Sequence, residues 1–196
     1  MMSESQMGMS VMAAIHERRS VRSYSPYVMD QSIVRSLLAA AVRAPTAKHE
    51  EPWIFAIVQD NSMLKRLSDL AKKLMAESES QAHVDRGAHP PDFFNIEHFN
   101  IFYNSGTLVV ICGKPLGEYV VADCWLAAEN LMLAAFSMGL GTCVIGSAVS
   151  ALNRPEIKSE LNIPSDVRAI APIIIGVPEG ETGLTPRKEP HICSWN

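Results

Sequence analysis

Two long segments carry apolar residues at helical spacing, which predicts two amphipathic helices. The first follows Asp30, a plausible N-cap, and ends before Pro45. Its apolar stripe consists of Ile33, Val34, Leu37, Leu38, Ala41 and Val42. The second helix opens at Asn61 or Ser62. Its stripe consists of Leu64, Leu67, Leu70, Ala71, Leu74 and Met75.

A third long segment, residues 120–138, is apolar on nearly every side. This composition predicts a central, buried helix rather than one that lies on the surface. Gly139 and Gly141 follow it and mark its end. Shorter helices are predicted over residues 11–18 and 155–161.

Short runs rich in Ile and Val predict strands, because they are too brief for buried helices. They cover residues 53–58, 107–113, 143–145 and 169–177. Helices and single strands alternate irregularly, and no strand–helix unit carries a phosphate-binding loop. This order favours an α+β fold with helices packed on a small mixed sheet.

Two segments show neither the helical spacing of apolar residues nor a strand-like apolar run. Residues 81–100 hold three histidines, two prolines and three phenylalanines, which predicts a long loop or a lid. Long loops in compact domains tend to be functional. Residues 178–196 are polar and rich in proline, and we expect a C-terminal extension there. The whole chain, 1–196, is predicted to form one domain with these two excursions.

Composition excludes several classes of protein. Seventeen basic residues stand against 21 acidic ones, a formal charge of -4, which argues against a nucleic-acid-binding protein. The four cysteines match no zinc spacing and are expected to be reduced, so we expect a cytoplasmic protein with no metal site. The strand-like apolar runs are too short to span a membrane, and residues 1–10 lack the features of a signal peptide.

Two basic clusters are candidates for binding a phosphate. The first is Arg18-Arg19-Ser20-Val21-Arg22, and the second is Arg187-Lys188. A guanidinium offers a planar fork of donors that suits phosphate oxygens. When the first cluster is taken alone, a solvated basic helix end explains it better than a ligand site does. Together, the two clusters have the charge to converge on one dianion.

Two further segments have the character of ligand loops. Residues 44–53 carry proline near both ends, which indicates a rigid loop that edges a planar ligand or simply connects a helix to a strand. Residues 139–146 are bounded by glycine but follow a predicted helix, which excludes a dinucleotide-binding turn. Glycine at such positions lets backbone N–H groups come close to a ligand.

Taken in order, these segments resemble the FMN-dependent nitroreductase family. Residues 17–24, ERRSVRSY, resemble its opening RRSxR motif, and residues 44–53, APTAKHEEPW, resemble its SPSxxNxQPW loop. Residues 123–146, DCWLAAENLMLAAFSMGLGTCVIG, are similar to its central helix and following strand. Residues 175–190, IGVPEGETGLTPRKEP, resemble its closing G-x-P…PRKP segment.

The resemblance implies an α+β fold and an intertwined homodimer with FMN at the subunit interface. It assigns flavin binding to three groups of residues. The phosphate and the ribityl chain are expected to be bound by Arg18, Arg19, Ser20, Arg22, Arg187 and Lys188. The isoalloxazine ring is expected to contact the loop residues Pro45, Thr46, Ala47 and His49. In the family this loop often reaches the ring from the other subunit. The backbone of Ile145 and Gly146 approaches the ring near its reactive nitrogen.

Three residues of the loop depart from the family pattern. His49 stands where the family has Asn, and Glu51 stands where it has Gln. An ionised carboxylate only accepts hydrogen bonds, whereas an amide also donates, so Glu51 is left out of the expected site. Lys48 either favours a flavin anion or points into solvent.

The implied activity is that of an FMN-dependent NAD(P)H oxidoreductase. NADH or NADPH delivers hydride, and a nitroaromatic, quinone or similar small-molecule acceptor is reduced in a ping-pong cycle. No catalytic protein residue is expected, because the flavin carries the chemistry. Phe93, Phe94 and Phe99 are expected to form a substrate wall or to pack across the dimer. A different reaction on the same flavin, such as enone reduction or dehalogenation, and a flavin-binding protein without activity remain alternatives.

Overall fold

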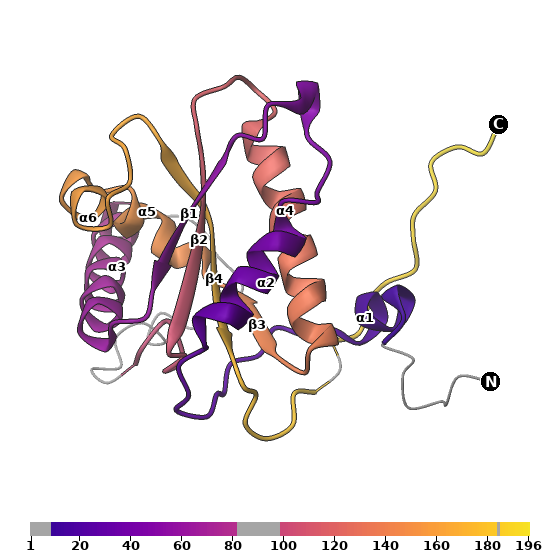
Figure 1. Cartoon of the computed structure of the whole chain (residues 1–196), viewed down its shortest axis with the longest axis horizontal. Coiled ribbons are helices and arrows are strands. Elements are labelled where there is room, and N and C mark those ends of the chain that lie inside the picture. The colour runs from indigo at the N-terminus through magenta and orange to yellow at the C-terminus, as the bar shows by residue number, and fades with distance from the viewer. Residues whose placement is uncertain (1–8, 82–98, 184) are drawn as a thin grey trace.

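The structure is a computed structural model, and it describes residues 9–81, 99–183 and 185–196. A four-stranded antiparallel sheet lies between two layers of helices (Figure 1). The strands are β1 (Trp53–Val58), β2 (Thr107–Gly113), β3 (Gly141–Val144) and β4 (Arg168–Gly176). Their order across the sheet is β1-β2-β4-β3, so the two longest strands are central.

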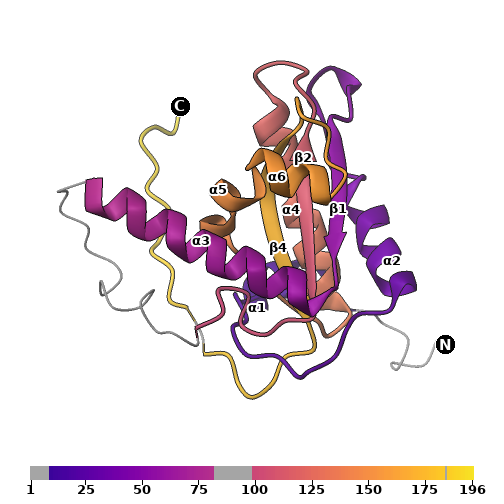
Figure 2. The same cartoon turned by 90° about the vertical axis from the view of Figure 1, so that its left-hand side faces the viewer.

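The helices divide between the two faces of the sheet (Figures 1 and 2). One face carries α2 (Gln31–Ala41) and α4 (Val120–Ser137), and α1 (Val11–Glu17) packs on α4. The other face carries α3 (Asn61–Gln81), α5 (Val149–Leu152) and α6 (Pro155–Glu160). The described residues also form two short 3-10 turns, η2 (Ala47–His49) and η4 (Gly146–Ala148).

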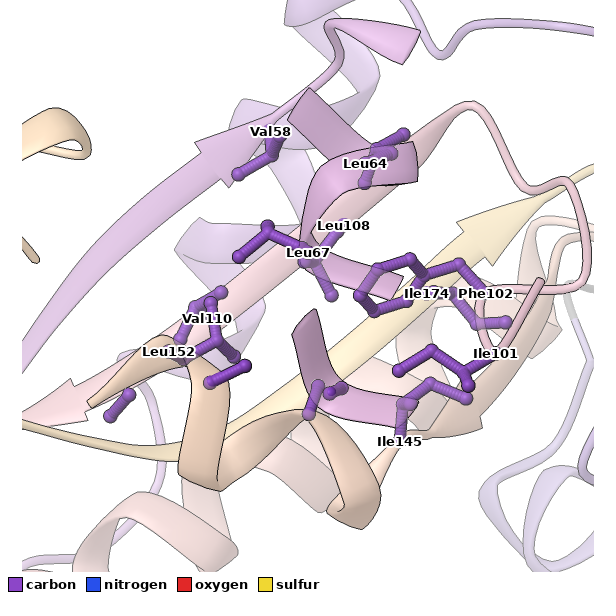
Figure 3. Packing of buried hydrophobic residues seen from close by; sticks show 14 of the residues in the cluster. Val58, Leu64, Leu67, Ile101, Phe102, Leu108, Val110, Ile145, Leu152 and Ile174 are labelled. Carbon is purple, nitrogen blue, oxygen red and sulfur yellow. The ribbon is translucent and has the colours of Figure 1, made fainter. Parts of the chain in front are cut away.

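The side chains of β2 alternate between two cores because successive residues of a strand point to opposite faces. Leu108 and Val110 join the core under α3, together with Phe102 and Leu67 (Figure 3). Val109 and its neighbours on the same face join the core under α2 and α4. Every residue of β2 is buried, which is why the strand reads as a continuous apolar run.

The predicted helices and strands agree with the structure to within a residue or two at most ends. The ladders are antiparallel, and a parallel bridge between Ser20 and Thr142 adds the mixed character expected of the sheet. The prediction did not include η2, η4 or α5. The segment 81–100, predicted as a loop, lies mostly outside the described residues, and Gln81 ends α3.

Helix α4 differs from the fully buried helix that its composition predicts. One side packs on the sheet and α2, but Val121, Trp125 and Leu126 are exposed, Trp125 by 40%. By length and composition alone, α4 is also the described helix that is apolar enough to cross a membrane, a test that core helices pass as well. Its apolar character therefore serves the core on one side and leaves an apolar surface on the other.

Candidate functional site

The arginine-bearing segment lies along the β3 edge of the sheet. Ser20 bridges to Thr142, and the Val21 N–H donates to the Thr142 carbonyl over 3.0 Å. Further along, the Ser25 N–H donates to the Val177 carbonyl at 3.0 Å. Through these backbone bonds, residues 18–25 form an extended strip that is attached to the sheet, although the sequence predicted a helix end there. The strip holds Arg18 to Arg22 in a defined position.

Tyr24 fixes the middle of this strip. Its ring is buried, and its hydroxyl donates to the Val21 carbonyl over 2.7 Å. A Cβ atom on Gly176 would lie 2.6 Å from the Tyr24 Cδ1 atom, so this approach requires glycine. Burial also raises the pKa of the Tyr24 phenol well above its usual range. The hydroxyl therefore remains a donor at any physiological pH.

A cavity of about 750 Å³ opens beside the strip. Its size falls in the range of small-molecule and cofactor sites. It is lined by Arg22, Met75, Phe99, Ile101, Tyr103, Cys143, Val144, Ile145, Gly146 and Ser147. Most of these side chains are apolar, and Arg22 is the charged one among them. The cavity suits a flat, largely apolar group with a polar edge.

Two ionisable side chains at the cavity, Cys143 and Tyr103, favour their neutral forms. Burial raises the pKa of the Cys143 thiol, although Arg22 opposes the shift. Burial likewise raises the pKa of Tyr103, again against Arg22. The ring of Tyr103 meets Phe99 edge to face at 5.6 Å between centroids. A second, smaller cavity of about 270 Å³ shares Arg22, Phe99 and Tyr103 with the first.

Three buried polar atoms near the strip lack a hydrogen-bond partner among the described residues. They are Arg18 Nε, Arg19 Nε and Thr142 Oγ1. Arg18 Nε lies 3.6 Å from Glu129 Oε1, an ion-pair distance that is too long for a hydrogen bond. A buried donor without an acceptor costs about 1–3 kcal/mol. Such unsatisfied donors fit an anionic ligand such as a phosphate.

The loop 44–52 lies at the other end of α4, next to the first turn of that helix (Figure 1). The Ala47 N–H donates to Asp123 Oδ1 over 3.1 Å, and the Lys114 N–H donates to the Pro52 carbonyl over 2.9 Å. Because α4 has 18 residues, its ends lie about 27 Å apart at the usual helical rise. Within one chain, Pro45, Thr46, Ala47 and His49 are not among the residues that line the cavity.

The backbone of the loop explains one departure from the family pattern. His49 has φ 57°, in the left-handed region, where Asn, Asp and His are enriched among residues other than glycine. His49 thus keeps the backbone preference of the Asn it replaces. Glu51 also lies in this region, at φ 43°, and its side chain is exposed.

The remaining predicted residues fall in three places. Ile145 and Gly146 line the cavity, as does Phe99, whereas Phe93 and Phe94 lie outside the described residues. Arg187 and Lys188 lie in the exposed segment 185–196, and no contact between them and Arg18 or Arg22 is seen in the described part of the chain. The structure unites Arg22 with Ile145 and Gly146 but not with the loop or the extension.

Sequence reasoning missed Tyr103, Thr142 and Asp123. Tyr103 follows a segment without periodicity and carries no local signal. Asp123 did carry one, because it is an acidic residue in an otherwise apolar helix segment and is only 4% exposed. A charge at such a position is expected to have a partner.

The family model named "Nitroreductase family" matches residues 15–177. The chain belongs to the nitroreductase family. A putative NADH dehydrogenase/NAD(P)H nitroreductase of Archaeoglobus fulgidus is 27% identical over 172 residues, which cover 85% of this chain and 84% of that protein. An FMN reductase (NADPH) of Bacillus subtilis is 26% identical over 186 residues, covering 88% of this chain and 68% of that protein.

Solved structures show the same fold. A nitroreductase with bound FMN from Bacteroides fragilis superposes with a TM-score of 0.81 at 24% identity, covering 96% of this chain and all of that one (100%). An iodotyrosine deiodinase bound to FMN and 3-iodo-L-tyrosine gives a TM-score of 0.73 at 20% identity, covering 93% and 97% of the two chains. This nitroreductase-family chain therefore shares its architecture with proteins named for two different reactions.

The Tyr24 hydrogen bond predicts a measurable loss of stability in this nitroreductase-family chain. Tyr24→Phe leaves the Val21 carbonyl without its buried donor and should lower the free energy of unfolding by about 1–3 kcal/mol. Tyr27→Phe is the matched control, because its exposed hydroxyl donates to Asp30. Urea unfolding of both variants measures the difference. Equal losses in the two variants would show that Tyr24 does not anchor the strip.

Proposed function

We propose that this chain is an FMN-dependent NAD(P)H oxidoreductase that reduces a nitroaromatic, a quinone or a similar small molecule. The observation that supports this most strongly is that one short segment carries both Arg22, which lines the mostly apolar cavity, and the unsatisfied buried donor of Arg18. FMN combines a phosphate with a flat ring system, and this segment offers cationic donors and the edge of an apolar cavity to these two parts. Membership of the nitroreductase family supports the same assignment.

The residues of the strip would hold the phosphate and the ribityl chain. Arg18, Arg19, Ser20 and Arg22 supply cationic and hydroxyl donors, and the buried Nε atoms of Arg18 and Arg19 have no other acceptor among the described residues. Arg187 and Lys188 would close on the same phosphate from the C-terminal extension. Ile145 and Gly146 edge the cavity, where their backbone would meet the ring.

When bound, FMN supplies hydride transfer between a nicotinamide and an acceptor. The chain itself binds, orients and excludes water: the apolar walls of the cavity dehydrate the ligand, and Arg22 favours negative charge at its edge. Because donor and acceptor use one cavity in turn, we expect ping-pong kinetics. No protein acid or base is assigned.

We place this site at the interface of an intertwined homodimer. The loop residues Pro45, Thr46, Ala47 and His49 do not line the cavity of their own chain, so they would serve the cavity of the partner. Apolar side chains are exposed on α1, on α4 and on the C-terminal extension. They include Val11, Met12, Ile15, Val121, Trp125, Leu126, Ile192 and Trp195. A second copy of the chain would cover this surface.

The second candidate keeps the fold and the flavin but changes the reaction. The similarity to an iodotyrosine deiodinase supports reductive dehalogenation as one such reaction, because that protein shares the fold. A flavin-binding protein without turnover is the third possibility, suggested by His49 and Glu51.

The free thiols of Cys112, Cys124 and Cys143 agree with a reducing, cytoplasmic location.

Cofactor reduction tests the reaction directly. Purified protein should bind FMN and turn yellow, and anaerobic NADH or NADPH should bleach the flavin absorbance near neutral pH. Subsequent addition of a nitroaromatic or a quinone should restore the absorbance. Tight FMN binding without bleaching by either nicotinamide would contradict the oxidoreductase and favour the protein without activity. Bleaching with reoxidation only by a halogenated phenol would favour dehalogenation.

The phosphate site predicts a loss of cofactor affinity in arginine variants. Arg18→Ala and Arg187→Ala should each weaken FMN binding by about 1.5–3 kcal/mol, the usual contribution of a charge-assisted hydrogen bond. Arg66→Ala is the control, because Arg66 pairs with Glu160 on the surface. Titration of FMN fluorescence gives the dissociation constants. Unchanged constants in both site variants would remove these residues from the phosphate site.

A further inference from the structure

The loop 44–52 stores backbone strain. Lys48, His49 and Glu51 have φ values of 59°, 57° and 43°, and none of them is glycine. Each residue held in this region costs on the order of 1–3 kcal/mol and persists only where its surroundings fix it. The side chains of these three residues are exposed, so they add no buried contacts that would hold the backbone in place.

In the described part of the chain, two hydrogen bonds tie the loop to elements that are distant in sequence. At its end, the Pro52 carbonyl accepts from the Lys114 N–H over 2.9 Å, just before the buried Trp53. At its start, the Ala47 N–H donates to Asp123 Oδ1 over 3.1 Å. Ala47 opens the η2 turn, so this bond fixes the residue from which the strained backbone begins.

Asp123 is placed to make that bond strong. Its carboxylate is buried, 4% exposed, and lies in the first turn of α4, where the helix dipole favours negative charge. A hydrogen bond to a charged acceptor is worth more than one to a neutral acceptor. Among the described residues, no salt bridge to Asp123 is seen. The Asp123 carboxylate accepts a hydrogen bond from the backbone N–H of Ala47. One carboxylate therefore couples the central helix to the strained loop.

We propose that Asp123 is a positioning residue that sets the conformation of the 44–52 loop, so that the loop meets the ring of FMN in the partner subunit. This inference rests on the proposed function. The simpler role, stabilisation of α4 alone, predicts a different result, because it would change the stability of the fold without changing the loop or its ligand.

The test compares three variants of the full chain. Asp123→Ala removes the acceptor, and Asp123→Asn keeps an oxygen at the same place but removes the charge. Asn130→Ala is the matched control on the same helix, because the Asn130 side chain donates to the Ala40 carbonyl of α2 at 3.4 Å, away from the loop. Thermal unfolding first measures the structural cost of each change.

Two readouts then report on the loop. In protein without FMN, hydrogen exchange at the Ala47 amide should accelerate about tenfold or more in Asp123→Ala, less in Asp123→Asn, and not in Asn130→Ala. FMN affinity should weaken about tenfold in Asp123→Ala, with partial recovery in Asp123→Asn and no loss in Asn130→Ala. If Asp123→Ala does not fold, the same comparison between Asp123→Asn and Asn130→Ala decides the matter.

Unchanged Ala47 exchange in a folded Asp123 variant would overturn the proposal, whatever FMN does. Faster exchange with unchanged FMN affinity would also overturn it, because the loop would then be set by Asp123 but would not serve the ligand. A failure of the proposed function has a different signature. Wild-type protein would then bind no FMN at all, while the exchange at Ala47 would still report whether Asp123 sets the loop.

Discussion

The central helix α4 is the element on which the whole site depends. The helix places the 44–52 loop at its first turn and the cavity edge, Ile145 and Gly146, shortly after its last. Within one chain, no residue of the loop lines the cavity. Neither part is a complete binding site for a flat, phosphorylated ligand. The exposed face of α4 between them is apolar, and this is the surface through which two chains would bring the parts together.

Buried polar groups mark both parts of the proposed site. On the strip that also carries Arg22, Arg18 and Arg19 have buried Nε atoms without a hydrogen-bond acceptor among the described residues. At the loop end, the Asp123 carboxylate is satisfied by a backbone N–H of a strained turn. The rest of the core is packed with Ile, Leu, Val and Ala. Proteins tolerate such polar costs mainly where a ligand or a function compensates them.

The sequence predicted the architecture because the strands and long helices have clear periodicities. The run 107–113 is apolar at every position because both faces of β2 are covered, and the stripes of α2 and α3 face the sheet. The helix α5 was missed because its four residues, Val149–Leu152, are too few to show a period. The packing of this segment against α3 and β4 fixes its shape, and a local pattern does not report such contacts.

The site was predictable only in part. Arg22, Ile145 and Gly146 were expected at one ligand and line one cavity, but Tyr103 was found only by its position in space. Composition made α4 look fully buried, because the exposed side chains of Val121, Trp125 and Leu126 are as apolar as those that face the core. The left-handed backbone of Lys48 and His49 has no signature in their residue types beyond the preference of His. The importance of Asp123 could have been predicted from the sequence, because it is a charged residue in an otherwise apolar helix segment.

Subunit complementation tests the shared site most directly. One chain carries Arg18→Ala and Arg22→Ala, and a second chain has residues 46–49 replaced by Gly-Ser-Gly-Ser. Each variant alone should bind FMN weakly. If the loop serves the partner's cavity, a mixed dimer isolated with two different tags contains one intact site and should bind one FMN with the affinity of the wild-type protein. A mixed dimer that binds FMN as weakly as both parent dimers would contradict the shared site.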